Sequence, residues 1–289
     1  MRLDGRRESS NVDDRRGGSR GKIAGIGGIG GIIIVALMVL MGGGNIGDVI
    51  QQVQGMPTEQ TTADGQQEFS AEEQELASFS KKILAGTEDV WSQIFKEKGW
   101  GEYQEPRMVL YTGSTSTACG QGDAQMGPFY CSGDQTVYID LSFFMNMRQQ
   151  LGADGDFAYA YVIAHEVGHH VQYLLGTLNE AHSQMNRMDK RDANRMSVRL
   201  ELQADYYAGV WAYHDNKNFG SLDDGDLEEG INCAGKIGDD YLQKKAQGYD
   251  IPDSFTHGTS QQRMRWLKAG YSSGDPDRGN TFDYNDNQL

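Results

Sequence analysis

The chain has 289 residues and a formal net charge of −15, with 41 Asp or Glu against 26 Lys or Arg. This acidity argues against nucleic acid as a partner, because a phosphate backbone requires a basic protein surface. The length is enough for one substantial domain, while 38 glycines and a hydrophobic content of 38% indicate additional polar or flexible stretches.

Charge is distributed unevenly along the first 47 residues. Residues 1–22 hold seven Lys or Arg and four Asp or Glu, and the next segment, IAGIGGIGGIIIVALMVLMGGGNIG at 23–47, holds no charged residue. A helix of this length can cross a hydrocarbon core of about 30 Å, and basic residues before a span predict a cytoplasmic N-terminus. We therefore expect a basic cytoplasmic head at 1–22, one transmembrane helix at 23–47 and an exported remainder. A cleaved signal peptide is the alternative, but the head is long and no A-x-A-like site follows Met41.

Glycine spacing within the predicted span suggests how it could associate. Gly27 and Gly31 have the small-x-x-x-small spacing at which membrane helices pack. A homo-oligomer through this span is one interpretation, and a simple Gly-rich anchor is the other. The residues that follow, 48–69, are rich in Gln, Thr and Gly and are expected to form a flexible linker.

The folded domain is predicted at residues 70–270, and it opens with a helix. Ser70 and Glu73 form a capping-box pattern, and apolar residues follow at a spacing of three to four as far as Gly99. Two later stretches, RMVLYTG and QTVYIDLSFF, are rich in β-branched and aromatic residues and predict strands.

The cysteines fit an oxidising compartment. Cys119 and Cys131 lie in one loop-like stretch, CGQGDAQMGPFYC, and are close enough in sequence to form a disulfide. Cys233 falls in a helical pattern and is expected to be a buried thiol. A disulfide that involves Cys233 remains an alternative.

Residues 157–175 predict a buried helix that carries several polar side chains, which are costly to bury without partners. The sequence HEVGH places His165 and His169 one turn apart, so both imidazoles can bind one ion. Glu166 lies beside the open coordination position, where it can act as the base toward a zinc-activated water. His170 points about 140° away from His165 around the helix and is expected to have a structural role.

A catalytic zinc ion needs a third protein ligand. The helix predicted at 192–213 offers Glu201 and, four residues later on the same face, Asp205. Glu201 would bind the metal, and Asp205 would accept the N–H of a ligating histidine. A solvated acidic face is the alternative, but the apolar and aromatic neighbours in ELQADYYAGVW argue against it. The rival third ligands are His182, which lacks a supporting partner, and His214.

The last part of the chain holds a fourth predicted helix at 227–245 and a polar tail at 271–289 that is expected to be disordered. Between them, THGTSQQR contains His257 and Arg263. A loop there could bring His257 to the site as a donor to the negative charge that builds on a carbonyl oxygen. Arg263 could neutralise a carboxylate near the site or hold that loop. An ordinary capping loop with surface charges is the alternative.

Together these motifs resemble the bacterial putative neutral zinc metallopeptidases, a gluzincin-like family. The resemblance covers most of the chain: the basic head and span, TACG, GPFYC, VYIDLSFF, FAYAYVIAHEVGHHVQ, ELQADYYAGVW, INCAGKIGDDYLQ and FTHGTSQQRMRW. It implies a zinc peptidase with His165, His169 and Glu201 at the metal, anchored in the bacterial inner membrane with its catalytic domain outside the cytoplasm. Distant relatives among the membrane gluzincins carry a similar His and Arg pair near their zinc, which favours functional roles for His257 and Arg263.

The expected fold is α+β: a mainly helical, zincin-like domain with a small antiparallel sheet, preceded by one transmembrane helix. TVYIDLSFF is expected to provide an edge strand to which an extended peptide adds. The expected function is zinc-dependent hydrolysis of peptide bonds outside the cytoplasm, with Glu166 as general base and Zn²⁺ as cofactor. One alternative is a non-catalytic zinc-containing binding module in the cell envelope, which an intact Glu166 disfavours. The other is a zinc hydrolase that acts on a non-peptide amide.

Overall fold

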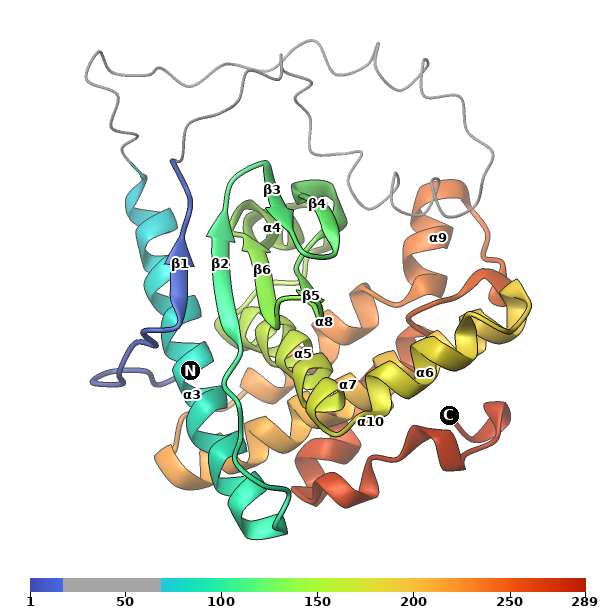
Figure 1. Ribbon diagram of the computed structural model, residues 1–289. Coiled ribbons are helices and arrows are strands. Elements are labelled where there is room, and N and C mark those ends of the chain that lie inside the picture. The colour runs from blue at the N-terminus through green and yellow to red at the C-terminus, as the bar shows by residue number, and fades with distance from the viewer. Residues whose placement is uncertain (18–68) are drawn as a thin grey trace, which may run out of the picture.

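Helices dominate the described part of the chain, which comprises residues 1–17 and 69–289 of the computed structural model (Figure 1). The helices are α3 (Ala71–Lys98), α4 (Ser142–Asn146), α5 (Asp156–Leu174), α6 (Thr177–Met185), α7 (Lys190–Phe219), α8 (Asp226–Lys236), α9 (Asp239–Gln247) and α10 (Ser260–Ser273), with the π-helical turn η3 (Met147–Leu151). The strands are β1 (Val12–Asp14), β2 (Arg107–Tyr111), β3 (Ser114–Thr117), β4 (Gly120–Asp123), β5 (Phe129–Cys131) and β6 (Thr136–Asp140). Short 3-10 helices are η2 (Ala124–Met126), η4 (Pro252–Ser254), η5 (Pro276–Arg278), η6 (Thr281–Asp283) and η7 (Asp286–Gln288). A mainly helical body with a small sheet confirms the predicted α+β class.

The main sheet is mixed, and the prediction of an antiparallel sheet is wrong. Its strand order is β1–β2–β6–β5. The pairs β1–β2 and β2–β6 are parallel, and β5–β6 is antiparallel. Between β2 and β6 the chain passes through the separate hairpin β3–β4 and through β5, and this long crossover allows β2 and β6 to pair in parallel. The stretch TVYIDLSFF forms β6, which lies between β2 and β5 and is therefore not an edge strand. On this side of the sheet the edge strand is β5.

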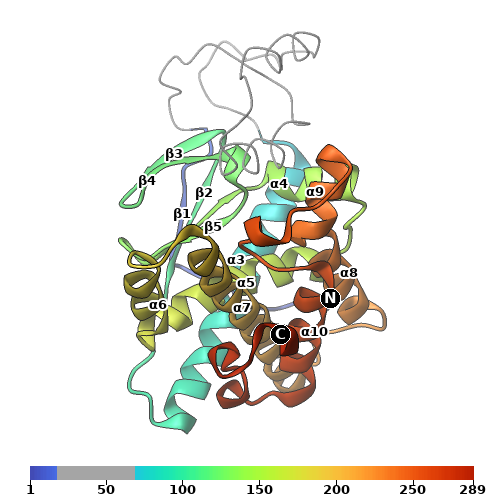
Figure 2. The same cartoon turned by 90° about the vertical axis from the view of Figure 1, so that its right-hand side faces the viewer.

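Helix α5 lies at the centre of the fold. It contacts α3, α6, α7 and α8 as well as β5 and β6, and in the side view of Figure 2 α5 and α7 lie between the strands and α8 with α10. Gly168 explains how closely α5 approaches α7. A Cβ atom at this position would lie 3.0 Å from the carbonyl oxygen of Ala204 and 3.1 Å from its Cα. The absence of a side chain at Gly168 therefore lets the polar residues of the two helices meet.

Local sequence accounts for the ends of the long helices. Ser70 and Glu73 form the predicted capping box of α3, and Gly99 ends that helix in the left-handed conformation. Helix α7 begins after Asp189, whose side chain accepts a backbone N–H of the first turn, and ends at Gly220. It extends beyond the predicted range at both ends.

The single helix predicted at 227–245 is wrong, because the chain breaks there into α8 and α9. The break is at Gly238, whose backbone is extended. A Cβ atom on Gly238 would lie 2.3 Å from the backbone nitrogen of Ser260 at the start of α10. The close approach of α10, a tertiary contact, interrupts a segment whose spacing is otherwise helical.

The tail predicted to be disordered, 271–289, is folded. It contains η5, η6 and η7, and both Thr281 and Leu289 are buried. Thr281 Oγ1 donates to the carbonyl oxygen of Arg199 at 2.7 Å, and Arg199 Nη2 donates to that of Tyr284 at 2.9 Å. The polar groups of the tail therefore bind α7, which composition alone does not reveal.

The described part of the head, residues 1–17, also belongs to the folded body. Strand β1 extends the sheet by pairing with β2. The Arg6 guanidinium lies 2.9 Å from the buried carboxylate of Asp215 on α7. On α3, Glu88 accepts hydrogen bonds from Ser9 Oγ at 2.5 Å and Asn11 Nδ2 at 2.9 Å.

This packing corrects the predicted topology and localisation. A single span between head and domain would place them on opposite sides of a membrane, whereas β1 and β2 are hydrogen-bonded neighbours in one sheet. Within residues 1–17 and 69–289, no helix combines the length and apolar character that a membrane crossing requires. The prediction of a single-pass inner-membrane protein with an extracytoplasmic domain is therefore contradicted. The predicted anchor at 23–47, with the pair Gly27 and Gly31, and nearly all of the predicted linker at 48–69 lie outside the described residues.

Candidate metal centre

Two neighbouring helices bring the predicted polar residues together. His165, Glu166 and His169 lie on α5, and Glu201 and Asp205 lie on α7. His165, His169 and Glu201 each offer one ligand atom, and these three atoms all lie within 4.8 Å of one another. We call these three side chains the ligand group.

Both histidines turn Nε2 toward the Glu201 carboxylate. Nε2 of His165 lies 3.0 Å from Oε2 of Glu201, and Nε2 of His169 lies 3.5 Å from Oε1. His165 is buried, and the other two residues are partly buried. Two imidazole nitrogens and one carboxylate oxygen are a ligand set that zinc takes in catalytic sites.

The other side of His165 is held by a buried ion pair. Nδ1 lies 2.7 Å from Oδ1 of Asp205, a carboxylate oxygen that accepts, so Nδ1 carries the hydrogen and Nε2 can present a lone pair. Arg263 donates from Nε and Nη2 to the two oxygens of Asp205, each at 2.9 Å. Tyr161 donates from its hydroxyl to Oδ1 of Asp205 at 2.5 Å. Asp205 and Arg263 thus both lie beside His165.

The other side of His169 is held by an amide. Nδ1 lies 2.9 Å from Oε1 of Gln172, and Nε2 of Gln172 donates to the carbonyl oxygen of Leu200 at 2.7 Å. Because that carbonyl can only accept, the amide nitrogen must face it and the amide oxygen must face His169. Nδ1 of His169 therefore also carries its hydrogen, so both histidines offer Nε2 to the same point.

The charges around the ligand group favour a bound cation. Burial raises the pKa of Asp205, but the charges of Arg263 and His165 outweigh it and hold this pKa at about 2. Burial likewise raises the pKa of Glu201, but the neighbouring histidines bring it well below its usual value. When no cation is bound, burial lowers the pKa of His165, whereas its carboxylate partners raise it to about 10. Arg263 balances Asp205, so Glu201 is the ionised carboxylate that directly faces the two imidazoles and is available to a divalent cation.

The ligand group lies in a cleft of about 470 Å³. One wall consists of residues 126–130, which lead into and form part of β5, and the lining also includes Leu178 and His182 of α6 and residues 256–257. Glu166 faces this cleft beside the ligand group, and burial raises the pKa of its carboxyl group. A raised pKa suits a carboxylate that accepts a proton and passes it on near neutral pH.

His257 lies in the cleft wall, with 48% of its side chain exposed. Its Nδ1 lies 3.4 Å from Oδ1 of Asp239. The other oxygen of Asp239 accepts the backbone N–H groups of Thr256, His257 and Gly258 at 2.8, 2.7 and 3.0 Å. Partial burial lowers the pKa of His257, but the charges of Glu201 and Asp239 raise it to about 9. The loop therefore holds a cationic imidazole at the cleft.

The other histidines considered from the sequence do not belong to the ligand group. His170 donates from Nε2 to a backbone carbonyl and accepts the Tyr130 hydroxyl at Nδ1, and burial lowers its pKa to about 4. His214 donates to the carbonyl oxygen of Gly274 at 2.8 Å. His182 lines the cleft, but its ring nitrogens are not among the converging ligand atoms.

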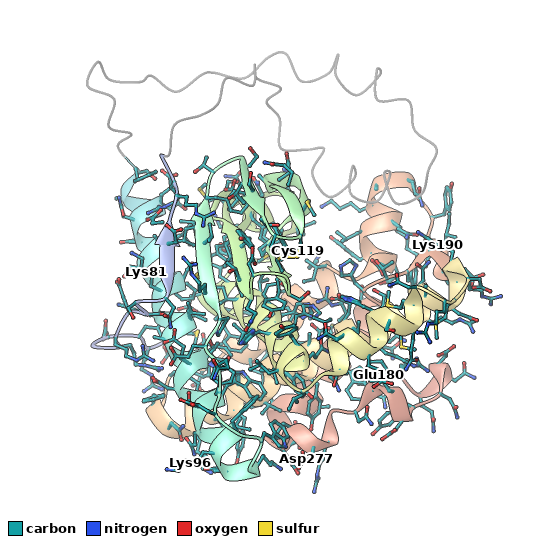
Figure 3. The ribbon with its side chains drawn as sticks, in the orientation of Figure 1. Lys81, Lys96, Cys119, Glu180, Lys190 and Asp277 are labelled. Atoms are coloured by element: carbon teal, nitrogen blue, oxygen red, sulfur yellow. A yellow bond between two sulfur atoms is a disulfide. The ribbon has the colours of Figure 1, made fainter. Side chains whose placement is uncertain are left out.

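Cys119 and Cys131 form the predicted disulfide, and Cys233 is free and buried. Cys119 itself lines the cleft, and Figure 3 shows it on the side of the sheet that faces α6 and α9. The two cysteines are 12 residues apart and enclose residues 126–130. The disulfide therefore closes the loop that supplies one wall of the cleft.

Sequence patterns did not single out Tyr161, Gln172 or Asp239. Tyr161 precedes His165 by four residues and Gln172 follows His169 by three, so both lie on the helix face of the ligands. Gln172 was also a polar residue in an apolar helix, which was the available signal. Asp239 acts on backbone groups 17 to 19 residues away, a contact that no local spacing indicates.

The histidine pair, the glutamate ligand and the adjacent Glu166 define a zinc-peptidase type of site, and comparison with known proteins agrees. The family model described as "Putative neutral zinc metallopeptidase" matches residues 1–282, and the chain belongs to this family. It is 50% identical over 287 residues to the uncharacterized protein YpfJ of Escherichia coli K12, covering 98% of this chain and 99% of that one. It is 41% identical over 190 residues to the uncharacterized protein Mb2605 of Mycobacterium bovis, covering 62% of this chain and 63% of the relative. No solved structure matches the chain.

Proposed function

We propose that this protein is a zinc-dependent endopeptidase, with His165, His169 and Glu201 as the metal ligands and Glu166 as the general base. The observation that carries the proposal is the convergence of two imidazole Nε2 atoms and one carboxylate in a cleft that Glu166 also faces. The tautomers derived for both histidines, together with the ionised carboxylate of Glu201 between them, fit a divalent cation. Membership of a family named for zinc metallopeptidases supports the same class of reaction.

A bound zinc ion supplies Lewis acidity, which makes water more acidic and a carbonyl group more electrophilic. The proton transfers fall to the protein. Glu166 accepts a proton from the attacking water as the water oxygen bonds to the carbonyl carbon. It then gives that proton to the amide nitrogen as the carbon–nitrogen bond breaks, which releases an amine and a carboxylic acid that ionises in solution.

His257 is proposed to stabilise the negative charge that builds on the carbonyl oxygen. Asp239 holds Nδ1 and the backbone of the loop, which leaves the Nε2–H of the imidazole for a group in the cleft. The adjacent charge of Asp239 raises the pKa of His257 and so favours the protonated donor. A donor positioned in advance is worth about 2.7–4 kcal/mol of the barrier in enzymes of this type.

Strand β5 is proposed to bind the substrate backbone. It is the outer strand of the sheet beyond β6, and Phe129 and Tyr130 line the cleft. An extended peptide can pair with such an edge through main-chain hydrogen bonds, which do not depend on the identity of its side chains. This geometry favours cleavage within a chain, which is endopeptidase activity.

The test combines metal analysis of the full chain with casein digestion followed by mass spectrometry. His165→Ala is expected to lose both zinc and hydrolysis, because it removes a ligand. Glu166→Gln is expected to retain zinc and lose about 10²–10⁴-fold in rate, the usual contribution of a general base. Glu180→Gln, an exposed change on α6, serves as the control that keeps both.

Wild-type hydrolysis by Glu166→Gln would exclude Glu166 as the base. A wild-type protein that binds zinc but cleaves no peptide would instead favour a non-catalytic zinc module or a hydrolase of another amide.

A further inference from the structure

The hydrogen bonds that start at Nδ1 of His169 continue past Gln172, beyond the residues of the proposed metal centre. Gln172 has no exposed surface and Gln203 is only 4% exposed. Nε2 of Gln172 donates to Oε1 of Gln203 at 3.0 Å as well as to Leu200 O at 2.7 Å. Nε2 of Gln203 in turn donates to the carbonyl oxygen of Gly279, between η5 and η6, at 3.0 Å. A chain of hydrogen bonds thus runs from a proposed metal ligand to the carboxyl-terminal tail.

The hydrogen bonds of this series can donate in only one direction, from His169 toward the carboxyl-terminal tail. The carbonyl oxygens of Leu200 and Gly279 accept, so each glutamine must turn its amide nitrogen toward them and its oxygen back toward the ligand group. Every donor in the series then meets an acceptor. This fixes the orientation of the Gln172 oxygen, and that oxygen fixes the hydrogen of His169 on Nδ1.

Gln172 also links the two helices that carry the ligands. Its oxygen holds His169 on α5, while its nitrogen holds the backbone of Leu200 on α7, the residue directly before Glu201. A single buried side chain therefore sets the orientation of one ligand and the backbone position of another. Hydrogen-bond partners of this kind commonly alter metal affinity by about 10–100-fold when removed.

We infer that Gln172 is a positioning residue for the metal centre, and that Gln203 supports it by tying it to the folded tail. The inference rests on the proposed function, because it takes His169 and Glu201 as metal ligands. The asymmetry with His165 follows from the same contacts. His165 donates to a charged carboxylate, whereas His169 donates to a neutral amide that depends on two further acceptors for its orientation.

The experiment measures zinc affinity of the full chain by competition with a chelator, together with the visible absorption of the Co²⁺-substituted protein. Gln172→Met keeps the side-chain length but removes the acceptor and the donor. It is expected to weaken zinc binding by about 10–100-fold and to change the Co²⁺ spectrum, because the His169 ring is no longer held. Gln203→Met leaves both contacts of Gln172 with His169 and Leu200 in place and is expected to cause a smaller loss.

Gln243→Met is the matched control. Gln243 is 1% exposed, accepts the backbone N–H of Ile251 at 2.8 Å and donates to Ser254 Oγ at 3.0 Å, with no contact to the ligand group. The Gln243→Met variant should be less stable than the wild type, because it loses these two buried hydrogen bonds. It should keep the wild-type zinc affinity and Co²⁺ spectrum. If Gln172→Met does not fold, Gln172→Asn is measured instead, since its shorter amide cannot reach His169 and Leu200 together and should weaken binding in the same direction.

Wild-type affinity and spectrum in the Gln172 variants would overturn the inference and leave the proposed function standing. Equal losses of affinity in Gln172→Met and Gln243→Met, with an unchanged spectrum, would show a purely structural role and overturn it as well. A wild-type chain that binds neither zinc nor Co²⁺ would overturn the proposed metal centre itself.

Discussion

The side chain of Asp205 has no exposed surface, and each of its oxygens is bound. A buried carboxylate is costly, and the cost is met here by the two-pronged contact with Arg263 and by the hydroxyl of Tyr161. The same carboxylate sets the tautomer of His165. Charge balance and ligand orientation therefore depend on one ion pair, and the loss of either partner should affect both stability and metal binding.

Arg263→Leu is expected to lower the free energy of unfolding by about 3–5 kcal/mol, because it removes the buried guanidinium that binds both oxygens of Asp205 and leaves His165 as the remaining charged partner. Urea unfolding in the presence of a chelator measures this apart from metal binding. Arg191→Leu is the control, since Arg191 and Asp253 form an exposed pair at 2.8 Å with 58% and 60% of their side chains accessible. An exposed pair of this kind contributes about 0–1 kcal/mol. Equal losses in the two variants would show that the buried pair of Arg263 and Asp205 contributes no more to stability than an exposed pair.

At this scale the sequence predicts which residues share a helix face, but not what lies opposite them. The four-residue spacings of His165 with His169 and of Glu201 with Asp205 follow from helix geometry. The approach of the two helices depends on Gly168 against Ala204, which spacing does not reveal.

Among the strands, β5 contributes Phe129 and Tyr130 to the cleft wall. It is a three-residue strand that pairs with β6 on one side only. The disulfide joins it to the turn after β3, and the Tyr130 hydroxyl binds His170 on α5. These two attachments fix a short strand whose outer edge is proposed to bind the substrate.

Replacing both Cys119 and Cys131 by Ser is expected to raise KM for peptides more than it lowers kcat, because it frees the cleft wall but leaves α5 and α7 intact. Zinc content should stay at the wild-type level, since no ligand lies in the loop. The free energy of unfolding should fall by about 2–4 kcal/mol, as is typical for a lost disulfide. Cys233→Ala removes the free buried thiol and serves as the control with unchanged KM. Loss of zinc in the double Ser variant would contradict the claim that the disulfide holds the cleft wall without affecting the ligand group.

Element prediction succeeded where the determinants are local and failed where they are not. The capping box at Ser70 and the left-handed Gly99 lie in the sequence of α3 itself. The break at Gly238 depends on Ser260 of α10, and the parallel pairing of β2 with β6 depends on the crossover through β3, β4 and β5. The spacing of apolar residues within a single segment therefore predicts neither the helix break nor the arrangement of the strands.

For the whole molecule, both ends of the described chain pack onto the central helices, although their composition suggested otherwise. From the sequence, the arginines of the head are expected to flank a membrane span on its cytoplasmic side. In the structure Arg6 pairs with Asp215 on α7, and Arg7 pairs with Glu88 and Asp89 on α3. An arginine carries the same charge beside a membrane span and in an ion pair within a folded domain. Only the position of its acidic partner distinguishes these two roles.

Glu88→Gln tests whether the head is docked in solution. Glu88 is 1% exposed, and its carboxylate binds Arg7, Ser9 and Asn11, all of them head residues. With the head docked, the change weakens hydrogen bonds to a charged group and should lower the free energy of unfolding by about 1.5–3 kcal/mol.

Hydrogen exchange gives a second measurement, because the backbone N–H of Arg15 donates to Leu110 O at 2.8 Å and should exchange faster in the variant. Glu97→Gln, on the exposed face of the same helix, should change stability by no more than about 0.5 kcal/mol.

If the head were undocked, Glu88 would lie on an open face of α3. Its neutralisation would then leave stability unchanged or raise it, and Arg15 would exchange rapidly in the wild type. The sign of the stability change therefore decides whether head and domain share one side of any membrane.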